Sequence, residues 1–351
     1  MIGYKYQDVM KCSLFIWSSS IYLFYQEGLM FKIISLLFLI TIISCTTQKK
    51  SNDDSKFGKD SIGQIDTTIA AKIEQDDSIV HVSDQFPPTI SGFKQMINKL
   101  DREELGSISI SKDFVFNKLP YSVKIPDSLT LAYSNFFYET LDHFNQTFYT
   151  EYPDIISKIE NDIFDEDCKN FEVMVNNNGL MIQMSEGTIY LDSSPDYFYT
   201  IFKSRVSESL ERFIEIRKNE QQEGFSEDGG MLITFEELGK RVRRWEDYIV
   251  KYPNAFYIED AKYYYNSYLA TFLIGMDNTR VYSLEDNVYI PEIREIYKDY
   301  YKKNSSQESA EIVRKYYNLI ESNGFQYNSN VQSFIERQNL DSYQGKQLHL
   351  R

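Results

Sequence analysis

The stretch "DYIVKYPNAFYIEDAKYYYN" (residues 247–266) decides the fold of this chain. Apolar and aromatic residues recur every three or four positions on both sides of Tyr252-Pro253, which is the spacing of one face of an α-helix. Proline ends a helix because it has no backbone N–H and its ring clashes with the preceding turn. The stretch therefore predicts two helices joined by a turn at Pro253.

Both predicted helices have recognisable ends. Thr234 and Glu237 have the spacing of a capping box, which begins a helix, and Gly275 stands where a left-handed cap would end the second one. The two apolar faces consist of Phe235, Leu238, Val242, Trp245, Tyr248 and Tyr252, followed by Ala261, Tyr264, Tyr268 and Phe272. Such faces are buried when helices pack against neighbours.

A second copy of this pattern follows at an offset of 52 residues, where "DYYKKNSSQESAEIVRKYYN" (299–318) aligns on 247–266 without gaps. The identical pairs are Asp247/Asp299, Tyr248/Tyr300, Lys251/Lys303, Tyr264/Tyr316, Tyr265/Tyr317 and Asn266/Asn318. The helices of this copy are predicted to begin at Pro291 and to end at Asn323-Gly324. Self-similar helix pairs are typical of helical repeats, in which neighbours bury each other's apolar faces.

The segment "WEDYIVKYPNAFYIEDAKYYY" (245–265) resembles a tetratricopeptide-type hairpin. It is particularly similar to the repeats of the lipoprotein subunit in the outer-membrane assembly machinery, where a Tyr-Pro turn joins two helices. The resemblance covers about 100 of the 351 residues, its spacing departs from the usual repeat of about 34, and the second copy lacks Tyr-Pro. It implies a TPR-like repeat region over 223–340 and leaves the function open.

The region 88–222 is predicted to be helical with a small β-meander. A helix is expected from Pro126-Asp127 to about Tyr149, and another from Ser194-Pro195 to about Lys218. The polar loop 219–230 is the expected boundary with the repeat region.

Two stretches of this region are predicted to form strands. Residues 107–116 alternate loosely, as a strand does. Between 171 and 192, Asn178-Gly179 and a second turn at 185–187 divide the sequence into three short runs, which predicts a three-stranded antiparallel meander. The predicted fold class is therefore mainly α, with helical hairpins in the C-terminal half and a β-meander near 171–192.

The N-terminal sequence has the features of an export signal. Residues 33–43 form an apolar run behind Lys32 that is short for a bilayer, since a spanning helix needs about 20 apolar residues. A positive start, an apolar centre and a small exit residue are typical of a secretory signal peptide. The exit Ile42-Ile43-Ser44-Cys45 resembles the bacterial lipobox, which implies cleavage before Cys45 and acylation of that residue. The alternative is an uncleaved N-terminal helix.

Residues 1–44 are therefore interpreted as signal peptide, and 1–29 as an over-long start, because the signal begins cleanly at Met30. Residues 45–87 hold few large apolar side chains and are predicted to be a flexible tether, and 341–351 a C-terminal tail. Asp53-Asp54 resembles the acidic tags that direct some Gram-negative lipoproteins to the cell surface. The expected location is the outer membrane, on either its periplasmic or its outer face.

The charge of the chain limits its partners. Its net charge is −15, and removal of 1–44 takes away three Lys and two acidic residues, which leaves 34 basic and 50 acidic side chains. Such a surface repels phosphate backbones, so no nucleic-acid partner is expected. The acyl chains on Cys45 are the expected membrane contact, because two or more chains give stable anchoring.

The sequence contains no motif typical of a catalytic, nucleotide or metal site. The three His, at 81, 143 and 349, lie near the tether, on the polar flank of a helix and in the tail, which disfavours a zinc centre or a serine triad. Cys168 follows three acidic residues, which would raise its pKa, and is interpreted as a small buried residue. No cofactor, metal ligand or catalytic residue is predicted.

Three residues are candidates for binding. Asp277 and Asn278 lie in "GMDNTRVY" (275–282), a polar loop directly after a capped helix, and loops on rigid scaffolds often carry binding residues. The simpler interpretation is a connection to the next helix pair. Trp245 is expected mainly to build the repeat, with any solvent-facing aromatic neighbours available to a partner.

The leading hypothesis is a non-enzymatic, lipid-anchored binding or scaffold protein of the cell envelope with a protein partner, because helical repeats usually present concave surfaces to proteins or peptides. A first alternative is a surface lipoprotein that captures glycans or nutrients, which exposed aromatics beside carboxamides would favour. A second is a hydrolase with a carboxylate pair, such as Glu186 and Asp192, which would need two acids in one cleft.

Overall fold

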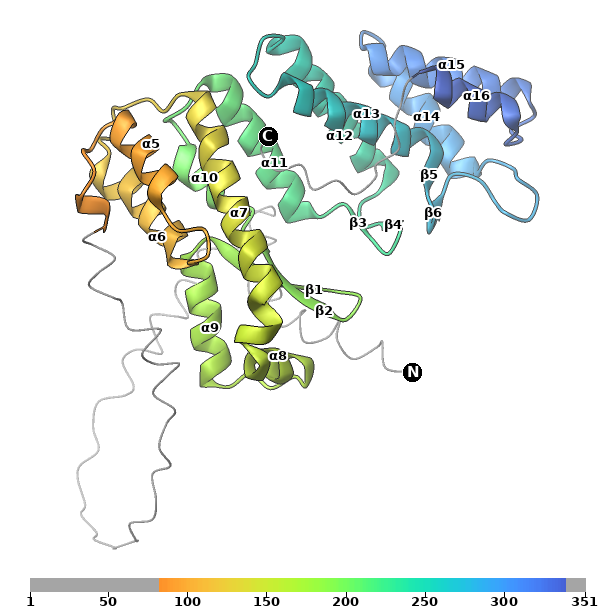
Figure 1. Cartoon of the computed structure of the whole chain (residues 1–351). Coiled ribbons are helices and arrows are strands. Elements are labelled where there is room, and N and C mark those ends of the chain that lie inside the picture. The colour runs from red at the N-terminus through yellow and green to blue at the C-terminus, as the bar shows by residue number, and fades with distance from the viewer. Residues whose placement is uncertain (1–81, 339–351) are drawn as a thin grey trace, which may run out of the picture. The chain divides into compact units, whose positions relative to one another are not determined.

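The computed structural model describes residues 82–338 (Figure 1). The predicted signal peptide 1–44 with its early start 1–29, the lipidation site Cys45, the tether up to residue 81 and the tail 341–351 lie outside the described residues. The last six residues assigned to the tether, 82–87, belong to the folded body, since Val82 and Phe86 pack against its core. The predicted boundary between tether and folded body at residue 87 therefore lies too far along the chain, because the two apolar side chains of this otherwise polar segment pack against the core.

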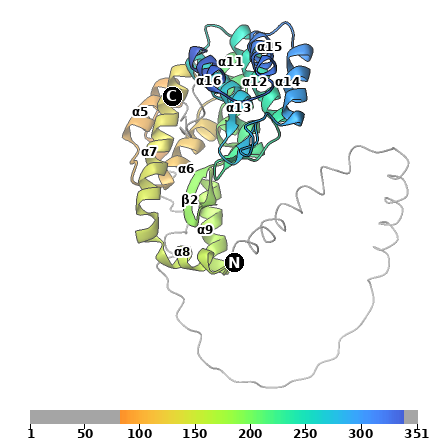
Figure 2. The ribbon, with the colours of Figure 1, turned by 90° about the vertical axis from the view of Figure 1, so that its right-hand side faces the viewer.

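The described chain is mainly helical, with small two-stranded antiparallel sheets. Its N-terminal elements are α5 (Ile90–Lys99), α6 (Gly106–Asp113), the π-helical η2 (Phe114–Lys118), α7 (Asp127–Glu151), α8 (Pro153–Glu160), α9 (Glu166–Asn177), β1 (Leu180–Ser185), β2 (Thr188–Ser193), α10 (Tyr197–Phe202) and α11 (Glu208–Glu223). The long helix α7 packs against α5, α6, α8 and β2 (Figures 1 and 2). The helix expected from Pro126-Asp127 is thus confirmed and forms the centre of this part.

Both strand predictions in this part need correction. Residues 107–116 are helical, in α6 and η2, and Ile108, Ser111 and Val115 are buried at helical spacing. The first run of the expected meander is also helical, because Cys168, Phe171 and Val175 on α9 face the core. What remains is a hairpin of β1 and β2, paired from Leu180↔Ser193 to Ser185↔Thr188.

The helix expected over 194–218 is divided into two. Helix α10 ends at Phe202, and Ser204 has a positive φ of 61°, which a continuous helix does not allow. Helix α11 begins after Ser207, whose hydroxyl accepts a hydrogen bond from the Leu210 N–H, and continues to Glu223. The loop predicted at 219–230 is therefore shorter than expected.

The C-terminal part consists of successive helical hairpins. Its elements are β3 (Ser226–Glu227), β4 (Gly230–Met231), α12 (Phe235–Lys251), α13 (Ile258–Ile274), β5 (Gly275–Met276), β6 (Thr279–Arg280), α14 (Pro291–Lys303), α15 (Glu308–Ser322) and α16 (Ser329–Arg337). Helix α12 packs on α13 and α14 on α15, and all four lie side by side in Figure 1. The helix ends predicted at Thr234, Pro253, Gly275, Pro291 and Asn323-Gly324 are confirmed to within a residue or so.

The residues shared by the two sequence copies occupy equivalent places in the two hairpins. Tyr248 and Tyr300 are buried on the first helix of each pair, and Tyr264 and Tyr316 are buried on the second.

Gly275 follows α13 with a φ of 72°, and a Cβ there would lie 2.5 Å from the Thr279 carbonyl oxygen. Only glycine fits this position without strain.

A buried carboxylate joins the two hairpins. Glu246 of α12 is 6% exposed and accepts hydrogen bonds from the backbone N–H groups of Glu308 (2.6 Å) and Ser309 (3.1 Å) at the start of α15. The first N–H groups of a helix have no partner within it and carry partial positive charge, so a carboxylate both accepts their hydrogen bonds and offsets their charge.

Among residues 82–338, no helix is long and apolar enough to cross a membrane.

Candidate functional site

A groove with a volume of about 800 Å³ lies between α12 and α14, the first helices of the two hairpins. Its floor is apolar and includes Phe235, Phe272, Ile296 and the ring of Tyr300. Phe235 and Phe272 are buried, whereas Ile296 is partly exposed. The groove therefore offers an apolar surface of the kind that side chains of a bound peptide can cover.

A glycine allows the helices on this floor to approach each other. A Cβ added at Gly239 of α12 would lie 3.1 Å from Tyr300 Cδ2 and 3.3 Å from Phe272 Cε2. Glycine within a helix costs about 1 kcal/mol relative to alanine, so a packing reason is expected for it. Here the missing side chain leaves room for the two rings.

Both walls of the groove carry charged side chains. The α12 wall carries Glu236, Lys240 and Arg243, and the α14 wall carries Glu292, Glu295, Asp299 and Lys303. At one end, Arg243 Nη1 donates to Asn304 Oδ1 at 3.1 Å and so links the two helices. A ligand in this groove would meet mainly cations along the α12 edge and mainly carboxylates along the α14 edge, with Glu236 and Lys303 as the exceptions.

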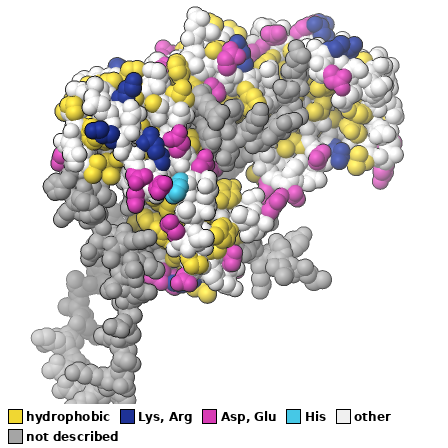
Figure 3. Space-filling model, in the orientation of Figure 1, with side chains coloured by type: hydrophobic (Ala, Val, Ile, Leu, Met, Phe, Trp, Pro, Cys, Tyr) yellow, Lys and Arg dark blue, Asp and Glu magenta, His cyan; other side chains and the backbone are white. Residues whose placement is uncertain are grey.

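A second hollow, of about 570 Å³, continues from the groove across α12 towards α11. It shares Lys240 and Arg243 with the groove and adds Arg212 of α11 and Arg244 and Lys251 of α12. Asp247 is the one carboxylate among its lining residues in the described part of the chain. This local excess of cations contrasts with the acidic side chains spread over the face seen in Figure 3.

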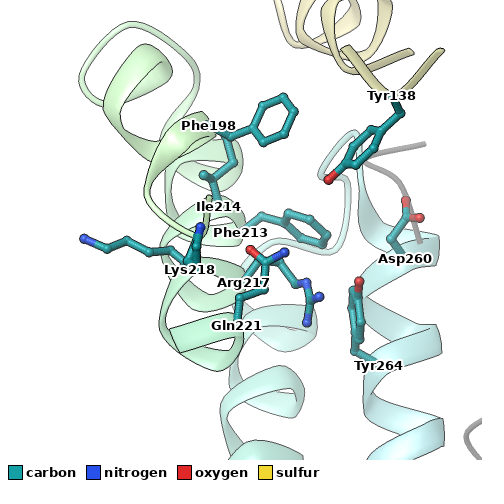
Figure 4. Close-up of a pocket in the computed structure, with 10 residues that line it drawn as sticks. Tyr138, Phe198, Phe213, Ile214, Arg217, Lys218, Gln221, Asp260 and Tyr264 are labelled. Atoms are coloured by element: carbon teal, nitrogen blue, oxygen red, sulfur yellow. The ribbon is translucent and has the colours of Figure 1, made fainter. Parts of the chain in front are cut away.

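A third, small cavity lies where α7, α11 and α13 meet (Figure 4). Tyr138 enters from α7, Arg217 and Gln221 come from α11, and Asp260 and Tyr264 come from α13. Its volume is about 30 Å³, and a cavity needs at least about 10–15 Å³ to hold one water. The cavity therefore has room for one or two waters and not for a sugar ring.

The carboxyl group of Asp260 is the acid of this cavity. Burial raises its pKa to about 6, and repulsion from Glu259 acts in the same direction. The Arg217 guanidinium, which stacks 4.1 Å from the centre of the Tyr264 ring, also pairs with Glu220 at 3.1 Å. Because no second carboxylate of residues 82–338 lines the cavity, it lacks the acid pair that glycoside hydrolysis requires.

Trp245, which was expected mainly to build the repeat, lies in the core of the structure. Its ring is fully buried, and its indole Nε1 donates to Glu220 Oε1 at 2.9 Å. Glu220 is 2% exposed and also accepts from the Tyr268 hydroxyl at 3.0 Å. Trp245 is thus a core residue that satisfies a buried carboxylate, because the inner face of α12 packs on α11 and α13.

Asp277 and Asn278 lie at the exposed tip of the β5–β6 hairpin, away from the groove. The Asn278 backbone N–H donates to the Gly229 carbonyl oxygen at 2.9 Å, and its side-chain amide donates to the Asp228 carbonyl oxygen. Asn278 therefore joins the β5–β6 and β3–β4 hairpins. The sequence did not predict this contact, and the binding role of the two residues stays a prediction.

The other residues considered for chemistry are dispersed. Glu186 is exposed in the β1–β2 turn, whereas Asp192 pairs with Met181 near the opposite end of the same hairpin. The Cys168 thiol is buried and donates to the Ile163 carbonyl oxygen at 3.3 Å, and burial raises its pKa. Within residues 82–338, no group of three or more His, Cys, Asp or Glu side chains is arranged to hold a metal ion.

Comparisons of the chain with protein-family models, with curated proteins and with solved structures gave no match. The function is therefore inferred from the groove and the hollow themselves.

The sequence did not reveal the groove residues. Lys240, Arg243 and Ile296 lie on the outward faces of helices whose sequence patterns specify mainly their buried faces. One signal was present, since Gly239 interrupts an otherwise strong helix-forming sequence and indicates a close approach at that level.

Proposed function

We propose that this protein is a non-enzymatic, lipid-anchored binding module of the bacterial cell envelope, whose groove between α12 and α14 holds a segment of a partner protein. The observation that carries the proposal is the groove of about 800 Å³ with an apolar floor and charged walls, formed by the first helices of two successive hairpins. Stacked helical hairpins of tetratricopeptide-like type commonly bind peptides on such a surface.

The dimensions favour a peptide over a small molecule. The groove and the hollow together are lined along α12 from Phe235 to Tyr252, a distance of about 25 Å at 1.5 Å per residue. An extended peptide of about eight residues spans the same distance at about 3.3 Å each. The charged walls would favour peptides whose own charges complement them.

The alternatives receive less support from the described residues. The aromatic rings beside Gln221 are packed between helices around a cavity for one or two waters, which counts against capture of a glycan there. A hydrolase would need a second acid near Asp260, and none of the described residues supplies one to that cavity.

The binding role is tested with a library of displayed random peptides selected on the purified protein. Peptides that bind should lose at least about tenfold in affinity for Ile296→Glu, because a charge on the apolar floor would have to be buried beneath the ligand. Leu284→Glu is the matched control, since Leu284 is 64% exposed and lies outside the groove. Equal affinity for both variants, or no selected peptide at all, would contradict the proposed site.

The anchor and the location need a separate test. Protease treatment of intact cells that express a C-terminally tagged form distinguishes an outer-face location, where the tag is lost, from a periplasmic one, where it is protected. A Cys45→Ala form should remain unprocessed and lack lipid label. Processing of that form at the same site would refute the lipoprotein assignment.

A further inference from the structure

From the charge of the hollow beside the groove, we infer that the partner segment is an acidic peptide whose carboxylates enter the hollow between α11 and α12. The inference rests on the proposed function and specifies the class of ligand. It depends on three observations: the sign of the hollow's lining, the way its cations are held, and its continuity with the apolar groove.

The lining of the hollow reverses the sign of the protein's charge. Among the described residues, five cationic side chains line it against the single carboxylate of Asp247, although the whole chain has a net charge of −15. The cations are Arg212, Lys240, Arg243, Arg244 and Lys251. An acidic protein would repel most acidic ligands, so a concave region lined mainly by cations directs such a ligand to one place, even though Glu208, Glu215 and Glu237 next to the lining offset part of its charge.

Each cation of the hollow is already held by a carboxylate of the chain. Arg212 pairs with Glu215 at 2.6 Å, Lys251 with Glu208 at 2.9 Å, and Arg243 with Asp247 at 3.5 Å. Lys240 and Arg244 both pair with Glu237. Apart from Asp247, these carboxylates do not line the hollow.

The exposed pairs do not prevent binding. Arg243 and Lys251 are 54% and 65% exposed, and exposed ion pairs contribute at most about 1 kcal/mol each. A ligand carboxylate can share or replace such a partner at little cost. The pairs instead hold the long side chains in place, which reduces the entropy that binding would otherwise remove.

The hollow and the groove form one continuous surface. They share Lys240 and Arg243, which lie one helical turn apart on the outward face of α12. A peptide along this helix can therefore place apolar side chains over Ile296 while its acidic residues face Arg212 and Lys251. The hydroxyl of Tyr252, which donates to Glu208 at 2.7 Å, lies beside the same end.

The test uses three fluorescein-labelled peptides of 12 residues in which the same leucine and phenylalanine positions are spaced by Glu, by Gln or by Lys. Fluorescence anisotropy with the full protein measures their affinities between 50 and 500 mM NaCl. The Glu peptide should bind at least about tenfold more tightly than the Gln peptide at low salt, and the difference should shrink as salt screens the charges.

Charge-reversal variants test whether the acidic peptide binds at the hollow. Arg212→Glu combined with Lys251→Glu, at two residues that line the hollow and not the groove, should weaken binding of the Glu peptide at least about tenfold and leave the Gln peptide within about threefold. The control is Arg314→Glu with Lys315→Glu on α15, which makes the same change in net charge at residues 51% and 60% exposed and outside the hollow. Circular dichroism of both double variants checks that they fold.

The outcomes separate this inference from the proposed function. If the Gln and Lys peptides bind as tightly as the Glu peptide and Ile296→Glu abolishes all three, the groove binds peptides and the acidic preference is refuted. If both double variants weaken the Glu peptide equally, the hollow is refuted as the site. If no peptide binds, the inference falls together with the proposed function.

Discussion

Replacing Asp260 with Asn should stabilise the protein at neutral pH and leave it unchanged at low pH. Burial raises the pKa of this carboxyl group from 3.8 to about 6, so the folded state disfavours the charged form. A shift of about two units corresponds to about 3 kcal/mol as an upper limit. Partial access to solvent and the loss of a favourable charge at the start of α13 reduce the expected gain to about 1–2 kcal/mol.

The sign of the pH dependence follows from the two pKa values. Below about pH 4 the carboxyl group is protonated in the folded and the unfolded chain, so it contributes no penalty. As the pH rises from about 4 to 6, the unfolded chain ionises more readily than the folded one, and the folded state loses stability. The stability gained through Asp260→Asn should therefore grow over this range and remain constant above it.

Urea unfolding followed by circular dichroism at several pH values between 4 and 8 measures the difference. Glu172→Gln is the matched control, because it removes an exposed carboxylate of α9 that does not line the cavity. The cations that line the cavity with Asp260 are Arg217 and Lys218 of the described chain. A variant that is less stable than the parent protein at pH 8 would show that these cations outweigh burial, and would refute the reasoning.

Two further substitutions test contacts that hold the hairpins. Glu246→Ala should lower the free energy of unfolding by about 1–3 kcal/mol, because the buried Ser309 N–H and the partly buried Glu308 N–H at the start of α15 lose their acceptor. Chemical denaturation measures this, and a change below about 0.5 kcal/mol would contradict the capping role. Gly275→Ala should lower the midpoint of thermal unfolding more than Gly187→Ala, because both glycines have a positive φ but only the first would place its Cβ against backbone. Equal shifts for the two variants would show that the close approach to Thr279 has no energetic effect.

Local signals in the sequence predicted the helical hairpins well. Thr234, Pro253 and Gly275 act through their own backbone and nearest neighbours, so their effects do not depend on the rest of the fold. The same holds for the aromatic spacing along α12 and α13. Where a signal was short, as over 107–116 and 171–175, alternation and helical spacing were both compatible with the residues, and burial against α7 and its neighbours decided for helix.

The sequence by itself determined the helix pairs and their ends, and it predicts lipidation at Cys45, because these features depend on residues close together in the chain. Only the tertiary structure decided that Trp245 donates a hydrogen bond to Glu220 in the core. It also decided that Arg212, Lys240 and Ile296 share one surface. These residues belong to three helices separated by long stretches of sequence, and the pattern of each helix specifies its buried face. Which outward faces come to lie side by side depends on how the helices pack, and that is a property of the whole fold.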